Sequence, residues 1–190
     1  MSKMETDILE LIKTKRSIFP ASYLDKPIDR TLIQEILECA HQAPNHKLTE
    51  PWRFVVFTNS GLGRLANELA RQYELTSSPD TYLEKKSKSI QEKILQSGAV
   101  IAICLHESGK IPKWEEIAAV ASAVQNMSIA ASTLGIGSYW SSTALINGLS
   151  AFLKLEENES CIGLFYMGYH NEERRYGKRT LLANKVRWED

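Results

Sequence analysis

The stretch AVIAICL at residues 99–105 is apolar at every position over the length of one strand. A strand with apolar side chains on both faces is expected at the centre of a sheet that is covered on both sides. Two further segments, WRFVVF at 52–57 and IGLFYMGY at 162–169, have the aromatic and β-branched composition of strands. The three segments predict one sheet with residues 99–105 at its centre.

Helical patterns surround these strands. We predict helices over residues 5–15, 29–40, 61–73, 82–96, 114–134 and 145–153, and a short strand or loop over 138–142. Asp29 is the expected N-cap of the second helix, Pro44 breaks its continuation, and Gly135 and Gly137 end the long fifth one. Trp114 is expected in the core or in a dimer contact.

This order of elements indicates the fold class. Helices come first, and strands then alternate with helices, which predicts an α+β sandwich with helices on the faces of one sheet. The whole chain, residues 1–190, fits a single domain. The GxGxxG and GxxxxGK[ST] fingerprints of Rossmann and P-loop proteins are absent.

Charge and composition exclude several classes of protein. Lys plus Arg and Asp plus Glu each total 23, so the chain has no general attraction to nucleic acid or to an acidic membrane. No apolar run is long enough to span a bilayer, and the first residues lack the apolar core of a signal peptide. We therefore predict a cytoplasmic protein that binds neither nucleic acid nor membranes.

Cysteine and histidine spacing gives no metal site. Cys39, Cys104 and Cys161 are far apart and odd in number, and we predict that Cys39 and Cys104 are buried, reduced thiols. The histidines show no HExxH or other paired ligand spacing: His41, His46, His106 and His170. The absence of GxSxG removes one common signal for a serine nucleophile.

Two polar segments in the first third of the chain are candidate sites. Lys15-Arg16-Ser17 places two cations and a hydroxyl at a helix end, which suits a phosphate or an anionic ring edge. The alternative is a solvated helix end, and for this segment alone it is the better interpretation. The segment from Gln42 to Lys47 places several polar donors in a stiff turn before a strand, where binding sites often lie. An ordinary surface loop beside a buried Trp52 explains the same segment equally well.

Two later segments are weaker candidates. Residues 134–142, LGIGSYWSS, combine glycines that permit close approach of a ligand, serine donors, and Trp140, which can stack on a ring. The alternative is a helix cap followed by a buried strand. Gly177-Lys178-Arg179 offers late cations that could close over a phosphate, although a solvated charge run is the usual explanation.

Taken together and in this order, these segments resemble the nitroreductase family of flavoproteins. The resemblance extends from about Ile8 to Trp188 and looks closest to the short branch of that family. Five motifs in register carry it: KRS at 15–17, APNHKLTEPWRF at 43–54, KIPKWE at 110–115, SYWSS at 138–142, and KRTLL at 178–182 with Trp188. The sequence departs from its relatives at Lys15, where Arg is common, and at Ser141, which is Arg in some of them.

The resemblance implies a nitroreductase-like sandwich, with a central mixed, mostly antiparallel sheet flanked by helices, and an intertwined homodimer that holds FMN at its interface. It implies that Lys15, Arg16 and Ser17 contact the ribityl phosphate and the polar edge of the flavin. Trp140, Ser141 and Ser142 would flank the isoalloxazine ring, and Lys178 or Arg179 would approach the phosphate. Gln42, Asn45 and His46 would reach in from the other subunit. A nicotinamide-binding role is associated with Ala130, Ala131, Ser132, Thr133, Leu134 and Gly135.

The implied activity is an oxidoreductase in which FMN passes a hydride from NAD(P)H to a nitroaromatic, a quinone or a similar small-molecule acceptor by a ping-pong mechanism. The sequence offers no obvious acid, base or nucleophile, which is expected when the cofactor carries the chemistry. It also carries no discriminator between NADH and NADPH. The alternatives are a flavin-binding storage or sensor module without nitroreductase turnover, a structural dimer with a degenerate site, and a relative that acts on flavin itself or on a halogenated aromatic.

Overall fold

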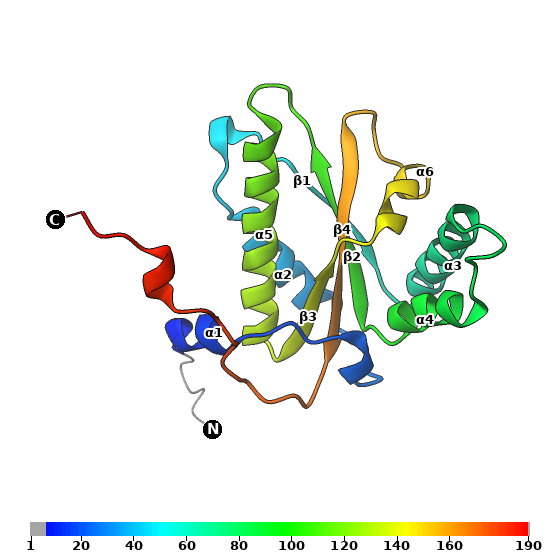
Figure 1. The fold of residues 1–190 in the computed structure, drawn as a ribbon, viewed down its shortest axis with the longest axis horizontal. Coiled ribbons are helices and arrows are strands. Elements are labelled where there is room, and N and C mark those ends of the chain that lie inside the picture. The colour runs from blue at the N-terminus through cyan, green and yellow to red at the C-terminus, as the bar shows by residue number, and fades with distance from the viewer. Residues whose placement is uncertain (1–6, 190) are drawn as a thin grey trace.

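The computed structural model describes residues 7–189, so positions 5 and 6 of the first predicted helix lie outside the described residues. Its centre is a four-stranded sheet in the order β1-β2-β4-β3 (Figure 1). The strands are β1 Trp52–Phe57, β2 Ala99–His106, β3 Ile136–Ser141 and β4 Glu159–Tyr169. Every pair is antiparallel, and β2 is buried along almost its whole length. The prediction of a central strand covered on both sides is confirmed.

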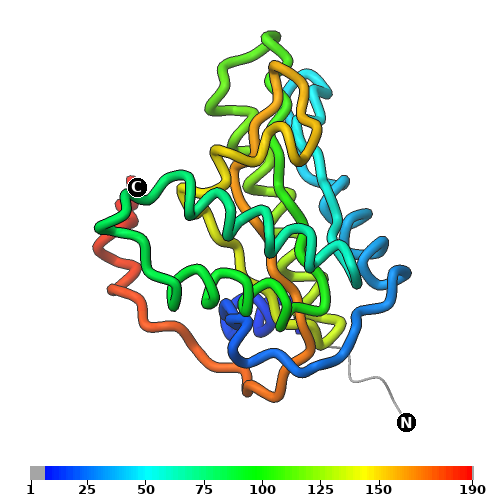
Figure 2. The backbone as a smooth tube through the Cα atoms, turned by 90° about the vertical axis from the view of Figure 1, so that its right-hand side faces the viewer, coloured from blue at the N-terminus to red at the C-terminus, as the bar shows by residue number. Residues whose placement is uncertain are grey.

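Helices cover both faces of the sheet. The α-helices are α1 Ile8–Thr14, α2 Arg30–His41, α3 Ser60–Thr76, α4 Glu84–Leu95, α5 Lys113–Thr133 and α6 Ser150–Leu153. Short 3-10 turns are η1 Pro20–Ser22, η2 His46–Leu48, η3 Ala144–Gly148 and η4 Leu182–Lys185. Figure 2 shows the antiparallel α3–α4 pair lying in front of one face, while α2 and α5 cover the other.

The two faces of β2 build two separate cores because successive side chains of a strand point to opposite sides. Ile101 and Ile103 pack into the core beneath α2 and α5, with Val120 and Met127 of α5. The alternate positions Val100, Ala102 and Cys104 belong to the other core, with buried side chains of α3 and α4: Leu65, Leu69 and Ile94. The continuously apolar sequence of β2 is thus required by helices on both sides.

Local chemistry sets the ends of the main helices. The Asp29 carboxylate accepts the Thr31 N–H at 3.0 Å and caps α2, as predicted. After α5, Gly135 adopts a φ of +72°, a left-handed conformation that glycine takes without strain. Gly137 has a different role, because it lies within β3 against Ile18 and His170. The predicted helix over 145–153 is divided into η3 and α6.

The exposure of several side chains bears on the sequence predictions. The prediction of a buried Cys39 is wrong, because this residue lies at the open groove between α2 and α5, whereas Cys104 is buried as expected. Trp114 is not in the core; it is 69% exposed at the start of α5, so the alternative of a dimer contact stays a prediction. In α1 only Leu11 is buried among the apolar residues, and Ile8 is exposed. The described helices include none that is long and apolar enough to cross a membrane.

Candidate functional site

A cavity of about 230 Å³ lies where the chain leaves α1 and passes beside β3. The segment after α1 is extended, and the Ile18 N–H donates to the Ser138 carbonyl at 3.1 Å. This bond holds Lys15 and Arg16 against the first residues of β3. The remaining wall comes from the end of α5 and from the chain after β4, including Ser132, Gly135, His170, Glu172, Glu173 and Arg174.

Arg16 is held by backbone groups and keeps an unused donor. Its Nη1 donates to the Lys15 carbonyl and its Nη2 donates to the Lys13 carbonyl at 2.6 Å. Its Nε is buried and has no hydrogen-bond partner among the residues that the structure describes. A methyl group on Gly177 would lie 2.7 Å from the guanidinium, so the backbone of the C-terminal segment packs directly against Arg16. A buried guanidinium donor of this kind is suited to an anion.

The electrostatics of the cavity also favour an anion. Burial, followed by the neighbouring charge of Arg16, lowers the pKa of the Lys15 ammonium. Within residues 7–189, neither Lys15 nor Arg16 forms an ion pair with a carboxylate. Of the two glutamates in the wall, Glu172 accepts a hydrogen bond from Ser22 and pairs with Arg175. The cavity therefore contains two partly buried cations without a direct carboxylate partner among the described residues, although Glu173 also lines its wall.

The far end of β3 carries the second part of the predicted site. Trp140 is 36% exposed, and its indole lies over Gly163 of β4. A methyl group at Gly163 would come within 1.9 Å of the indole nitrogen, so the absence of a side chain there gives the ring its place. Ser141 ends β3, and Ser142 follows it in an exposed position. These residues do not line the cavity of Lys15 and Arg16, but the single strand β3 connects the two places.

Asn45 and His46 lie near the start of α5, at the opposite end of this helix from the cavity. The Asn45 side chain accepts the Glu50 N–H at 3.1 Å, and His46 Nδ1 is 2.6 Å from the carboxylate of Glu115 in the first turn of α5. Lys15 and Ser132, in contrast, share the cavity at the other end of that helix. A helix of 21 residues is about 30 Å long, so one chain does not bring the two groups together.

The six residues associated with nicotinamide are divided among three environments. Ala130, Thr133 and Leu134 line an open groove of about 400 Å³ between α2 and α5, together with Gln42. Ser132 and Gly135 line the cavity of Lys15 and Arg16. Ala131 is fully buried in the core beneath the sheet.

The C-terminal cations are brought close to the cavity by their neighbours. The Tyr176 hydroxyl donates to Glu10 at 2.6 Å, and Gly177 packs against Arg16. Lys178 and Arg179 follow directly and are exposed. Sequence reasoning missed His170 and Arg174, whose Nη2 donates to the Ser132 carbonyl at 3.3 Å. No local motif marks them, since they reach the cavity only because β4 ends there.

This chain is similar in sequence to a known protein family and to individual proteins of that family. The family model described as "Nitroreductase family" matches residues 12–169, which include β3, the loop of Asn45 and the part of the cavity wall that comes before the end of β4. The chain belongs to the nitroreductase family. It is 28% identical over 179 residues to YfhC of Bacillus subtilis, whose provisional name is NAD(P)H nitroreductase, covering 93% of this chain and 91% of that protein. YdjA of Escherichia coli, provisionally named in the same way, is 30% identical over 166 residues, or 85% of this chain and 87% of YdjA.

Solved nitroreductase structures have the same fold. A nitroreductase-like family protein from Bacillus cereus matches all of this chain over its own full length, with a TM-score of 0.85 and 25% identity. A nitroreductase with bound FMN from Bacteroides fragilis has a TM-score of 0.70 at 22% identity, covering 97% of this chain and all of that one. The predicted nitroreductase-like α+β fold is thereby confirmed.

The residues of this nitroreductase-family chain fit the flavin cofactor implied by its family. The buried Nε of Arg16 has no hydrogen-bond partner within residues 7–189 and is a donor that suits a phosphate oxygen. Gly177 lets the C-terminal segment pass directly against the same guanidinium, because any side chain there would collide with it. Trp140 offers a partly exposed aromatic ring on β3, the strand whose first residues line the cavity.

Proposed function

We propose that this protein is an FMN-dependent NAD(P)H oxidoreductase. The observation that carries the proposal is the buried Nε of Arg16, which has no partner in the described part of the chain, beside the half-buried Lys15. Bound FMN supplies the hydride chemistry. Arg16 and Lys15, with Ser17, hold the phosphate and the polar edge of the flavin, and Lys178 or Arg179 screens the phosphate from solvent. Trp140, Ser141 and Ser142 flank the flat ring and exclude water from it.

With FMN bound, Lys15 and Arg16 would stand near its polar edge, where fixed cations would favour added negative charge without reorganisation. One shared binding place would serve donor and acceptor in turn, which is the ping-pong order that we propose. The nicotinamide donor lies along the end of α5, at Ser132 to Gly135, and the acceptor is a nitroaromatic, a quinone or a similar flat molecule.

We also propose that the working unit is a homodimer. Asn45 and His46 lie a helix length away from Lys15 within one chain, so they reach a flavin only in a second copy. Exposed apolar side chains of the kind that an interface covers are concentrated on α1, at the start of α5 and along the C-terminal segment: Ile8, Leu9, Ile12, Trp114, Leu181, Leu182 and Trp188. The partner's Gln42, Asn45 and His46 complete each site.

The test is the flavin content of an Arg16→Ala variant, measured from the visible absorption of the pure protein. We expect FMN occupancy to fall strongly while the melting temperature of the apoprotein changes little, because Arg16 bonds only backbone carbonyls. Arg64→Ala, on the exposed side of α3, is the matched control and should keep its flavin. Normal occupancy in Arg16→Ala would remove Arg16 from the site.

Steady-state kinetics separate an enzyme from a flavin-storing or flavin-sensing module. With FMN bound, NAD(P)H oxidation should require an added quinone or nitroaromatic, and double-reciprocal plots at several acceptor concentrations should be parallel. A yellow protein that does not oxidise NADH or NADPH with either acceptor would instead be a binding module.

A further inference from the structure

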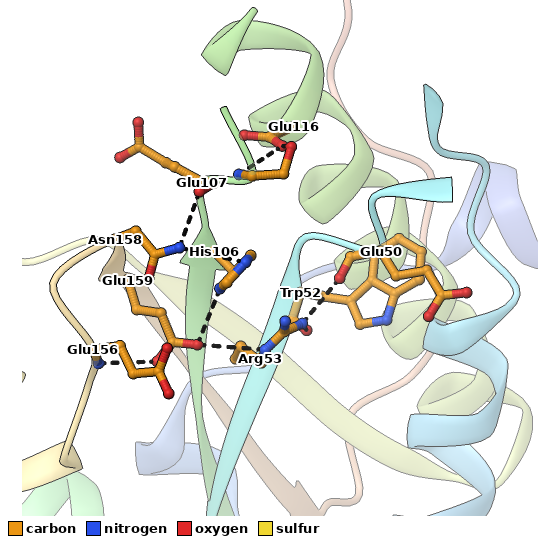
Figure 3. Close-up of polar contacts among 10 residues, drawn as sticks. Glu50, Trp52, Arg53, His106, Glu107, Glu116, Glu156, Asn158 and Glu159 are labelled. Carbon is orange, nitrogen blue, oxygen red and sulfur yellow. Dashed lines mark hydrogen bonds and ion pairs between the residues drawn. The ribbon is translucent and has the colours of Figure 1, made fainter. Parts of the chain in front are cut away.

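A second group of chemically active side chains lies at the opposite end of the sheet from the Arg16 cavity. His106 ends β2 and Glu159 begins β4, and the two are register partners. At the other end of β4, His170 follows the strand and lines the cavity. An eleven-residue strand is roughly 35 Å long, so the two places are distinct. Figure 3 shows the group at the strand ends.

Three potential metal ligands converge here. One atom each of His106, Glu156 and Glu159 lies within 4.8 Å of the other two. His106 Nδ1 is 3.4 Å from a carboxylate oxygen of Glu159. Two ligand atoms that each lie about 2.1 Å from a tetrahedral zinc ion are themselves roughly 3.4 Å apart. The His106–Glu159 spacing already equals that of two ligands on one ion.

The imidazole of His106 has an unused nitrogen. Nδ1 is buried and has no hydrogen-bond partner in the described part of the chain. On the other side of the ring, the amide nitrogen of Asn158 donates to Nε2 at 3.4 Å and to the Glu107 carbonyl at 3.1 Å. Because an amide nitrogen only donates, this contact leaves the ring proton on Nδ1, and a metal that binds at Nδ1 must drive that proton to Nε2 and break the contact.

The charges of the group also call for a cation. Glu159 is mostly buried, and its second carboxylate oxygen accepts the Glu156 N–H at 3.2 Å, so the turn brings the two glutamates together. The neighbouring cation is Arg53, whose Nε is 3.4 Å from Glu159 while its Nη1 donates to two backbone carbonyls. Glu156 is exposed and has no ion-pair partner among the described residues, so its carboxylate is free to bind a cation.

The geometry points to a binding site for one divalent cation of the zinc class, formed by His106, Glu156 and Glu159, with water in the remaining position. A neutral imidazole and two carboxylates balance the charge of the ion. Zinc has no redox chemistry, so the site ties the turn before β4 to the end of β2 rather than taking part in hydride transfer. Arg53 opposes binding through its charge.

The experiment uses FMN-loaded, EDTA-treated protein titrated with Zn²⁺ by calorimetry, with the flavin spectrum recorded in parallel. We expect one Zn²⁺ per chain, a higher melting temperature, and an unchanged flavin spectrum. Glu156→Gln, at an exposed position that leaves the core intact, should weaken binding at least tenfold, as should His106→Gln. Glu157→Gln, the adjacent exposed glutamate outside the group, is the matched control and should bind normally.

Arg53→Gln should bind Zn²⁺ more tightly than the wild type, because the competing positive charge is removed. This variant gives an effect of opposite sign, which loss of folding does not produce. The proposal is overturned if Zn²⁺ does not bind stoichiometrically, or if Glu156→Gln and His106→Gln bind as well as the control. Equal or weaker binding by Arg53→Gln likewise contradicts it.

Discussion

At the scale of single residues, the proposed site is defined by polar groups without hydrogen-bond or charge partners in the described chain, and by an aromatic ring that requires a neighbouring glycine. Arg16 keeps a buried donor, Lys15 is a half-buried cation without a carboxylate partner among the described residues, and Trp140 depends on the missing side chain of Gly163. Buried polar groups are ordinarily satisfied, and exceptions of this kind indicate function.

Lys15→Met should have opposite effects on stability and on flavin binding. The pKa of Lys15 is lowered in the folded state, so the unfolded chain binds more protons between the lowered value and the ordinary one. Stability therefore rises with pH in that window, and the charged form costs stability at neutral pH. The apoprotein of the variant should melt at a higher temperature, while its FMN affinity falls by about 10- to 100-fold, as expected for a lost charged hydrogen bond. Differential scanning fluorimetry and flavin titration check the pair; equal or lower apoprotein stability contradicts the argument.

Gly163→Ala should displace Trp140. Overpacking of this kind costs about 1–3 kcal/mol, and the flavin site loses its aromatic wall at the same time. In a Trp140→Ala background the same substitution should cost much less, because the clash with the indole is gone and only the tight approach to the Ser141 carbonyl, at 3.0 Å, remains. A double-mutant cycle by urea unfolding measures this coupling. Additive effects would show that the two residues do not meet.

At the scale of secondary structure, apolar period and capping were sufficient to predict β1, β2, β4 and the main helices. What they did not predict depends on tertiary or quaternary contacts. The apolar face of α1 is largely exposed in a single chain, and the segment over 145–153 divides where η3 packs beneath β4. The His106 group was also invisible in the sequence, since His106 is 50 or more positions away from Glu156 and Glu159 and meets them only through strand register.

The N-cap of α2 gives a pH-dependent prediction. The Thr31 backbone N–H, and then the Thr31 hydroxyl, lower the pKa of Asp29 in the folded state. Its contribution to stability is therefore complete above the ordinary aspartate pKa and is lost as the pH falls through the lowered value. Asp29→Ala should reduce the melting temperature at pH 7, and the gap from wild type should narrow as the solution is acidified. Asp29→Ser, which retains a capping oxygen, should lie between the two at pH 7; a gap that is constant down to pH 2 contradicts the assignment.

At the scale of the whole molecule, the C-terminal segment after Gly177 extends away from the domain with its apolar side chains exposed (Figure 1). The exposed side chains are Leu181, Leu182, Val186 and Trp188. An apolar segment of this kind is stable in water only when a partner covers it. The single chain therefore shows exposed apolar side chains but not what covers them, which is why sequence reasoning reached the dimer through family resemblance alone.

Serine at all four of these positions should weaken self-association without unfolding the domain. Sedimentation velocity over a range of concentrations should show a shift from dimer towards monomer. A variant with serine at three exposed leucines of the α3–α4 side, Leu75, Leu83 and Leu95, loses similar apolar surface elsewhere and should stay dimeric. Dissociation of both variants to the same extent would indicate a nonspecific loss of solubility instead.

The length of α5 has a genetic consequence. Because this helix separates Arg16 from Asn45 by its full extent, each catalytic pocket of the proposed dimer draws on two polypeptides. A chain defective only at Arg16 and a chain defective only at Asn45 are each inactive alone, yet a heterodimer of the two regenerates one intact pocket out of two. Co-expression of two dead alleles should therefore restore up to a quarter of normal turnover when the subunits mix at random.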